Sequence, residues 1–179
     1  TLVVVDEAYV HYSGQSFLSR LGEFPNLVIL RTLSKIGLAG IRLGILVANT
    51  DVVREVNKVR MPYNVNALSQ AAARVVLAHG DVVARHAALT VKERDRAVAA
   101  LGALPGVRAF PSQANFVLVR TRRPGELVCD ELLARGIVVR NFSRAPHLAD
   151  CLRVTIGAPE ENAAFLGALS EILGPGSDT

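Results

Sequence analysis

The sequence is poor in aromatic residues and in cysteine, and each shortage excludes a class of protein. It has no tryptophan, and aromatic residues make up 5% of its 179 positions, so we expect an aliphatic core. Two cysteines, Cys129 and Cys151, are too few for a disulfide-stabilised scaffold, and their spacing fits no zinc motif. No other metal-ligand spacing is present, so we expect no metal site. We therefore expect reduced thiols in a cytoplasmic protein.

Long hydrophobic runs and dense basic clusters are also missing. No stretch reaches the apolar length that spans a membrane, so no membrane partner is expected. The net charge of +4 slightly favours anionic partners, but the basic residues are scattered and no aromatics alternate with them. The densest cluster, RTRR at 120–123, is interpreted as a solvated turn. We expect no nucleic-acid partner.

Half of the residues are hydrophobic, and the first third of the chain groups them into three short runs. The runs at 2–5 and 27–30 are typical of strands buried on both faces of a parallel sheet, joined by a crossover. A third strand is predicted at 43–48, antiparallel to the second because the loop between them is short. Asp6 and Lys35 then lie just beyond strand ends, at the edge where open α/β sheets bind ligands.

The remaining pattern predicts helices and a second, smaller sheet. We expect a domain at 1–80, a long connecting helix at 81–104, and a small α/β domain at 105–179 with helices on one face of its sheet. Inside the last domain the predicted strands cover 115–120, 136–140 and 151–157, and the predicted helices cover 124–135 and 159–173. The fold class is therefore α/β.

The stretch RTLSKIGLAGIRLG at 31–44 raises the question of what Lys35 does. A Walker loop places its lysine after the glycines, whereas Lys35 precedes Gly37 and Gly40, and no GxGxxG is present. A Ser–Lys hydrolase needs S-x-x-K with partner motifs, but position 32 is threonine and the partner motifs are absent. A third possibility is a lysine that forms a Schiff base with pyridoxal phosphate.

Pyridoxal phosphate needs a carboxylate at its ring nitrogen and a cradle for its phosphate. Asp6 at a strand end can supply the carboxylate. Thr32, Ser34 and Arg42 can supply the cradle, with Arg42 in a bidentate fork. Taken singly, these features have ordinary explanations, since an Asp after a strand is often a turn former and a Lys in a glycine loop is usually solvated.

The motifs V-V-D-E-A-Y, L-R-T-L-S-K and L-A-G-I-R-L-G, in this order and at these separations, resemble the fold-type I pyridoxal-phosphate aminotransferases, in particular the histidinol-phosphate aminotransferase family. The resemblance continues through N-F-V-L-V-R, R-G-I-V-V-R and C-L-R-V-T-I-G, nearly to residue 173. It implies the C-terminal part of a mixed-sheet large domain, followed by a small α/β C-terminal domain, in a homodimer.

The resemblance also implies a role for each matching residue. Lys35 carries the Schiff base and moves the substrate's proton, and Asp6 pairs with the pyridine nitrogen. Tyr9 bonds the cofactor's phenolic oxygen. Ser34 and Arg42 hold its phosphate, assisted by Thr32. Arg153 resembles the arginine that binds the substrate's anion, and Arg140 resembles its partner at the substrate phosphate.

The function implied is transamination between histidinol phosphate and 2-oxoglutarate in histidine biosynthesis. The same core residues serve other fold-type I aminotransferases, including aromatic ones, and threonine-phosphate decarboxylases. The family's first half has no counterpart here and the sequence begins at Thr1 within an apolar run, so we expect a C-terminal portion of a longer protein. A folded, non-catalytic fragment is the alternative from a different functional class.

Overall fold

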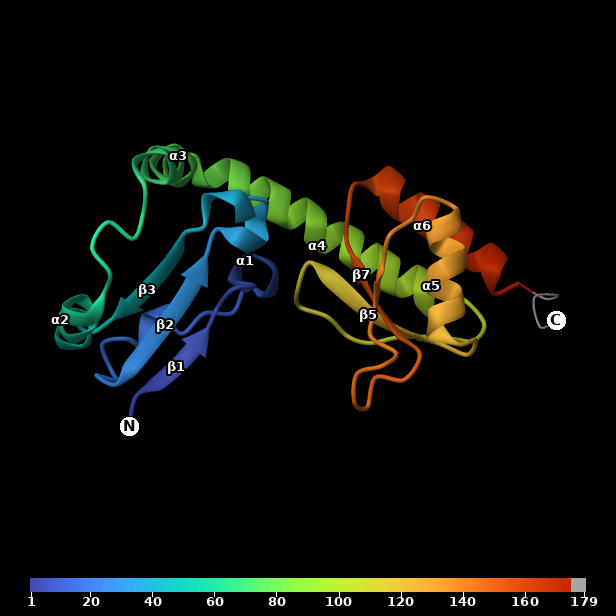
Figure 1. Cartoon of the computed structure of the whole chain (residues 1–179), viewed down its shortest axis with the longest axis horizontal. Helices are drawn as coiled ribbons and strands as arrows, with labels where there is room; N and C mark the ends of the chain where they lie inside the picture. Colours follow the sequence, from blue (N-terminus) through green and yellow to red (C-terminus); the bar gives the residue numbers. More distant parts are fainter. Residues whose placement is uncertain (175–179) are drawn as a thin grey trace. The chain divides into compact units, whose positions relative to one another are not determined.

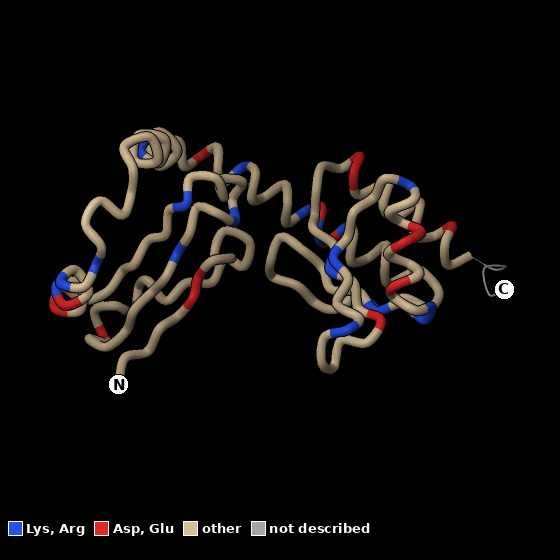
Figure 2. The backbone as a smooth tube through the Cα atoms, in the orientation of Figure 1, with Lys and Arg blue, Asp and Glu red and all other residues tan. Residues whose placement is uncertain are grey.

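The computed structural model describes residues 1–174 and divides the chain into two compact units, residues 1–87 and residues 88–179 (Figure 1). The division falls inside the long helix α4 (Gly80–Gly102). Each unit has its own sheet. Basic and acidic positions are interspersed along the backbone in both units (Figure 2). No helix within residues 1–174 combines the length and the apolar character needed to cross a membrane.

The first unit is built on a sheet of three strands in the order β1 (Val3–Asp6), β2 (Leu27–Thr32) and β3 (Gly44–Ala48). β1 runs parallel to β2, with Asp6 opposite Leu30. β3 runs antiparallel to β2, with Gly44 opposite Thr32. Both strand directions agree with the prediction made from the lengths of the connections. The carboxyl ends of β1 and β2 therefore lie side by side.

The expectation that β1 is buried on both faces is wrong for this structure. Val3 and Val4 are 51% and 55% exposed, whereas Leu27, Val28 and Ile29 of β2 are buried. The reason is topological: within residues 1–174, β1 pairs with β2 alone and forms an edge of the sheet. A run of β-branched residues thus identifies a strand but does not by itself bury it.

Short helical segments and two longer helices complete the first unit. The short ones are α1 (Val10–Ser13) and the 3₁₀ turns η1 (Leu18–Arg20), η2 (Ser34–Ile36) and η3 (Ala39–Ile41). The longer ones, α2 (Thr50–Val59) and α3 (Ala67–Ala78), begin after Asn49 and Asn66, whose side chains accept bonds from the amides of Asp51 and Ser69. Ser69 Oγ also donates to the carbonyl of Ile41 at 2.8 Å, which ties α3 to η3.

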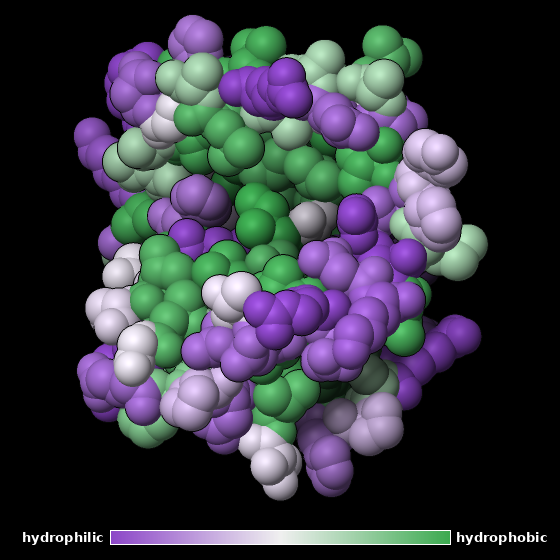
Figure 3. All heavy atoms as spheres, turned by 90° about the vertical axis from the view of Figure 1, so that its left-hand side faces the viewer, coloured by the Kyte–Doolittle hydropathy of each residue, from purple (hydrophilic) through white to green (hydrophobic). Residues whose placement is uncertain are grey.

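Much of the apolar surface of the first unit is exposed. On α3 only Ala73 is buried, while Leu68, Val75 and Leu77 are exposed. The view in Figure 3 shows hydrophobic residues in broad patches between hydrophilic ones. The interior of this unit is accordingly small and lies mainly along β2.

The second unit has a four-stranded sheet in the order β4-β5-β7-β6, antiparallel throughout. The strands are β4 (Val107–Ala109), β5 (Phe116–Thr121), β6 (Arg140–Asn141) and β7 (Cys151–Thr155). Helices α5 (Gly125–Ala134) and α6 (Pro159–Ile172) join the C-terminal part of α4 in covering it. Cys129 and Cys151 are free thiols.

One face of this sheet packs into the core and the other carries the arginines of interest. Val117, Val119 and Leu152 are fully buried and pack with residues of α4, α5 and α6. Because successive strand residues alternate between faces, Leu118 and its partner Arg153 lie on the opposite face. The helices therefore lie on one side, as predicted, and leave the Arg153 side for other contacts.

The strand predicted at 136–140 is shorter than expected, since only Arg140 and Asn141 pair with β7. Gly136 has φ 76° and continues from the end of α5, with its amide donating to Leu133. The amide of Ile137 donates to Leu132 in the same turn. The amide of Ile137 is thus used in the turn that ends α5 and not in the sheet, and residues 137–139 form no strand.

Candidate functional site

Lys35 lies in η2, three residues after the end of β2, on the exposed surface of the first unit. Its ammonium group lies over the ring of Tyr9, with 5.5 Å between Nζ and the ring centroid. This is cation–π contact distance. Within residues 1–174 Lys35 forms no ion pair, so its amine is held by an aromatic face and not by a carboxylate.

Asp6 and Tyr9 approach Lys35 from the end of β1. Asp6 ends the strand, and its Oδ1 accepts a hydrogen bond from the amide of Ala8 at 2.9 Å. This bond turns the chain, so that Tyr9 follows in the segment that faces Lys35. The parallel pairing of β1 with β2 is what brings these residues near Lys35, since Asp6 and Tyr9 lie 29 and 26 positions before it in the sequence.

Thr32 and Ser34 are joined by a local hydrogen bond, from the Ser34 amide to Thr32 Oγ1 at 3.0 Å. The chain then returns through η3, and the amide of Leu33 donates to the carbonyl of Leu43 at 3.3 Å. Arg42, directly before Leu43, is thereby brought back to the segment that holds Ser34. Its φ of 57° is left-handed, and its guanidinium Nη1 donates to the carbonyl of Ala39 at 3.4 Å.

An ion pair between Arg31 and the buried carboxylate of Glu7 was not predicted from the sequence. The carboxylate of Glu7 accepts bonds from Arg31 Nε at 3.0 Å and from the Phe17 amide at 2.6 Å. Burial acts to raise the pKa of Glu7, but the bonds from Phe17, Arg31 and Ser16 together with the Arg31 charge outweigh it, and the pKa is lowered. No local sequence pattern indicates this pair, because Glu7 becomes a neighbour of Arg31 only through the register that places Asp6 opposite Leu30.

Arg140 and Arg153 lie directly opposite each other on β6 and β7 of the second unit. Both guanidinium groups lie over the ring of Phe142, at 5.4 Å and 5.9 Å from its centroid, and Arg153 also lies 5.2 Å from that of Phe116. Nε of Arg153 is buried and has no hydrogen-bond partner within residues 1–174. Two like charges in register and an unsatisfied buried donor favour an anion between these strands.

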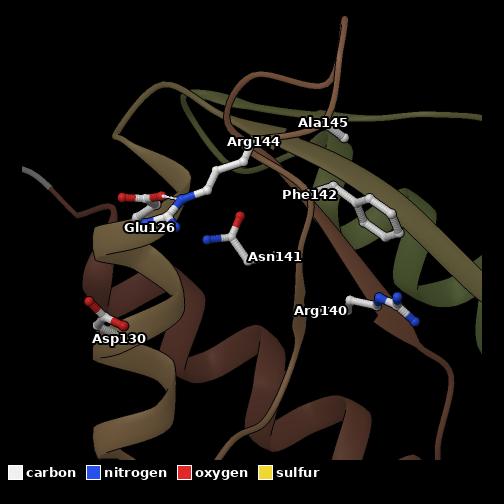
Figure 4. Close-up of a pocket in the computed structure, with 7 residues that line it drawn as sticks. All are labelled: Glu126, Asp130, Arg140, Asn141, Phe142, Arg144 and Ala145. Carbon is white, nitrogen blue, oxygen red and sulfur yellow. Dashed lines mark hydrogen bonds and ion pairs between the residues drawn. The ribbon is translucent and has the colours of Figure 1, made fainter.

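A cavity of about 520 Å³ borders Arg140 of this pair, between β6, the following loop and α5. It is lined by Glu126, Asp130, Arg140, Asn141, Phe142, Arg144 and Ala145 (Figure 4). Arg144 is paired with Glu126 at 2.7 Å, so its charge is compensated. Figure 4 shows Arg140 on the side of Phe142, away from Glu126 and Asp130. Of the two arginines that line the cavity, Arg140 is therefore the one whose positive charge can attract an anion.

The predicted residues thus form two groups. Asp6, Tyr9, Thr32, Ser34, Lys35 and Arg42 gather at the β1–β2 end of the first unit, and Arg140 and Arg153 pair on the sheet of the second. Within the described part of the chain there is no cluster of three or more side chains suited to a metal ion. The first group combines a lysine, a carboxylate and hydroxyl groups, and the second combines two arginines.

Comparison with known proteins matches residues 1–169 to the family described as aminotransferase class I and II. A histidinol-phosphate aminotransferase of Chromobacterium violaceum is 52% identical over 169 residues, which cover 94% of this chain and 47% of that protein. The chain thus spans about half the length of the curated relatives that it matches.

Solved structures show the same fold. The histidinol-phosphate aminotransferase from Clostridium acetobutylicum aligns with a TM-score of 0.87 and 28% identity, over 96% of this chain and 54% of that one. The histidinol-phosphate aminotransferase from Sinorhizobium meliloti, in complex with pyridoxal-5'-phosphate, aligns with a TM-score of 0.81 and 28% identity, over 97% of this chain and 49% of that one.

Proposed function

Because the chain belongs to the aminotransferase class I and II family, we propose that the whole protein is a pyridoxal-phosphate-dependent aminotransferase acting on histidinol phosphate. The observation that carries the proposal is the approach of Lys35 and Tyr9, with Nζ 5.5 Å from the ring centroid, at the end of the two parallel strands. An accessible amine at the carboxyl edge of such a sheet is placed to meet a bound carbonyl compound.

The residues of the first unit fit pyridoxal phosphate. When bound, the cofactor supplies an aldehyde that condenses with amines and a ring that accepts electrons from the substrate's Cα. Asp6 is an exposed carboxylate suited to hold a proton on the ring nitrogen, and Tyr9 would donate a hydrogen bond to the phenolic oxygen. Ser34 and Arg42 are brought to the same turn and would bind the phosphate, with Thr32 beside them.

Lys35 has two tasks in this proposal. Its Nζ would hold the bound cofactor between turnovers, and the same amine would accept and return the proton of the substrate's Cα. The absence of an ion pair to Lys35 within residues 1–174 supports this assignment, since a lysine locked to a carboxylate cannot leave to bind another group.

Arg140 and Arg153 are proposed to bind the phosphate of the amino substrate. Two arginines opposite each other can each donate two hydrogen bonds to a dianionic group. The phosphate would also accept a bond from the buried Nε of Arg153, which has no partner within residues 1–174. The amino group then passes to 2-oxoglutarate in the second half of the reaction, and the product belongs to histidine biosynthesis.

Other fold-type I enzymes, including an aromatic aminotransferase or a threonine-phosphate decarboxylase, need the same lysine and aspartate. The identity of 52% to a relative named histidinol-phosphate aminotransferase favours the first assignment.

We further propose that residues 1–80 form part of the cofactor-binding large domain, that residues 81–104 connect it to the small domain at 105–179, and that the whole protein acts as a cytoplasmic homodimer.

Reductive labelling tests the proposal. The whole protein is incubated with pyridoxal phosphate, reduced with borohydride, digested and analysed by mass spectrometry. We expect the adduct at Lys35 in preference to Lys58 and Lys92, which are exposed lysines of the same chain. Lys58 is a useful control because it is ion-paired to Glu55 at 2.6 Å. Equal labelling of the three side chains would show that Lys35 has no special reactivity, and the proposal would be wrong.

A further inference from the structure

The hydroxyl group of Tyr12 donates a hydrogen bond of 2.6 Å to the main-chain carbonyl of Lys35, across 23 positions of the sequence. Tyr12 lies in α1, which follows the end of β1, and Lys35 lies in η2, which follows the end of β2. The bond therefore joins the two segments that carry the proposed cofactor-binding residues. Its acceptor is on the backbone of the lysine on which the proposed chemistry depends.

The backbone around Lys35 has little support of its own. η2 is three residues long, has no side-chain cap, and ends at Gly37 with φ 89°. A 3₁₀ turn of this length has weak internal hydrogen bonds. The amides of Ile36 and Leu38 both donate to the carbonyl of Leu33, at 3.3 Å each, so they leave the carbonyl of Lys35 available. Within residues 1–174 the partner described for that carbonyl is Tyr12.

The donor, in contrast, is fixed by local bonds. The amide of Tyr12 donates to Tyr9 at 2.9 Å, and the amide of Val10 donates to Glu7 at 3.0 Å. Gly14 then ends the turn with φ 67° and donates back to Val10. Since residues three apart lie on the same side of a helical turn, Tyr9 and Tyr12 both face Lys35. Tyr9 contacts its side chain, and Tyr12 contacts its main chain.

We propose that Tyr12 is a positioning residue that sets the orientation of Lys35 towards the cofactor. The inference rests on the proposed function, because it concerns what Lys35 presents to pyridoxal phosphate. The hydroxyl fixes the carbonyl, and hence the Cα, of Lys35 against the segment that carries Asp6 and Tyr9. The direction in which Nζ leaves the backbone is set by that bond.

The test removes the hydroxyl alone, with Tyr12→Phe in the whole protein. Ser13→Ala is the matched control, because it deletes a neighbouring hydroxyl of α1 whose one bond within residues 1–174 is local, from the Gln15 amide at 3.3 Å. The rate of borohydride-trapped labelling with pyridoxal phosphate is measured at Lys35, Lys58 and Lys92. Loss of one neutral hydrogen bond predicts a fall of between about two-fold and about ten-fold at Lys35 alone.

A second readout is made without cofactor, by hydrogen exchange of the segment 33–38. We expect faster exchange there in Tyr12→Phe and wild-type exchange in Ser13→Ala, with the thermal unfolding midpoint of both variants near that of the wild type. In steady-state assays kcat falls while KM for the amino substrate is retained, since Tyr12 does not touch the substrate in this proposal.

Three results would contradict the proposal. Wild-type labelling of Lys35 in Tyr12→Phe would show that the hydroxyl does not orient it. Equal losses in Tyr12→Phe and Ser13→Ala, together with a lowered unfolding midpoint, would show a purely structural role of α1. Uniform labelling of the lysines in the wild type would instead overturn the proposed function on which the inference rests, so the two failures are distinguishable.

Discussion

At the scale of single residues, the carboxylate of Glu7 holds together the loop that precedes the candidate site. It accepts bonds from Ser16 Oγ, from the Phe17 amide and from both Nε and Nη2 of Arg31. Its side chain is 4% exposed, whereas that of Arg31 is 27% exposed. A charge this buried is stable only because several donors surround it.

The first prediction concerns the pH dependence of this pair. The pKa of Glu7 lies below its ordinary value of 4.5. The ionised group therefore adds stability that is fully present above pH 4.5 and is lost as the pH falls through the lower folded-state pKa. We expect Glu7→Gln to lower the free energy of unfolding by about 1.5–3 kcal/mol at pH 7, by loss of charged hydrogen bonds.

Urea denaturation of wild type and Glu7→Gln at a series of pH values measures this difference. It should shrink as the pH falls below 4.5, because the wild-type carboxyl is then protonated as well. Asp51→Asn is a suitable control, since Asp51 pairs with Arg54 on the surface, where both side chains are more than half exposed. A difference for Glu7→Gln that stays constant with pH would show that the charge is not what stabilises the loop.

Residue chemistry made part of the site predictable and left part of it hidden. Asp6 and Lys35 could be found because each follows an apolar run, and strand ends collect ligand-binding groups. Arg140 and Arg153 could be found only through the resemblance to a family. The bonds of Glu7 to Arg31 and of Tyr12 to Lys35 join positions 24 and 23 residues apart, and no local pattern encodes such a contact.

At the scale of elements, strand direction was predictable and strand burial was not. The short link between 32 and 44 forced β3 to run antiparallel to β2, and the structure agrees. β1 has the composition of a buried strand, yet Val3 and Val4 are exposed, because burial depends on what else packs on the sheet. For 136–140, the helix-ending turn at Gly136 competed with the strand and took the amides of Gly136 and Ile137.

The second prediction concerns the first residue of α5. The amide of Gly125 donates to Asp150 Oδ1 at 3.0 Å, and a Cβ placed on Gly125 would overlap Ser143 Oγ and lie 3.0 Å from Asp150 Cα. Because Asp150 Cα belongs to the main chain, the loop that carries Asp150 would have to shift to make room for the added Cβ. We expect Gly125→Ala to lower the free energy of unfolding by about 1–3 kcal/mol, as overpacking does.

Gly167→Ala is the matched control, since it makes the same chemical change in α6, where a Cβ meets nothing within 4 Å. There alanine should raise the free energy of unfolding by up to about 1 kcal/mol, through its higher helix propensity. Calorimetry of the two variants compares the unfolding midpoints. If both glycines tolerate alanine equally well, the close approach of the Ser143–Asp150 loop to α5 is wrong.

At the scale of the whole molecule, the fold class could be predicted but the completeness of the site could not be judged from the chain alone. The α/β class followed from the alternation of apolar, strand-like runs with predicted helices, and it agrees with the alignment to a solved aminotransferase at a TM-score of 0.87. The chain covers 47% of the length of the Chromobacterium violaceum relative, and the activity of the whole protein is accordingly a proposal.

The last prediction concerns the substrate of the whole protein. Arg140→Gln and Arg153→Gln should each slow the half-reaction with histidinol phosphate by about ten-fold to 100-fold, which corresponds to the loss of charge-assisted hydrogen bonds to the phosphate. The same variants should change the reaction with unphosphorylated histidinol much less, because that substrate lacks the dianion. The decay of the cofactor's absorbance in single-turnover mixing, with the amino substrate alone, measures both rates.

Arg108→Gln is the control for loss of an arginine that lies over a phenylalanine, since Arg108 of β4 lies 4.8 Å from the ring centroid of Phe110 and is outside the proposed site. It should react with both substrates at the wild-type rate. Unchanged use of histidinol phosphate by the Arg140 and Arg153 variants would remove the basis for this substrate. Equal losses with both substrates would show that the arginines bind a group other than the phosphate. Selectivity for the phosphorylated substrate is therefore the property of the whole protein that Arg140 and Arg153 are predicted to create.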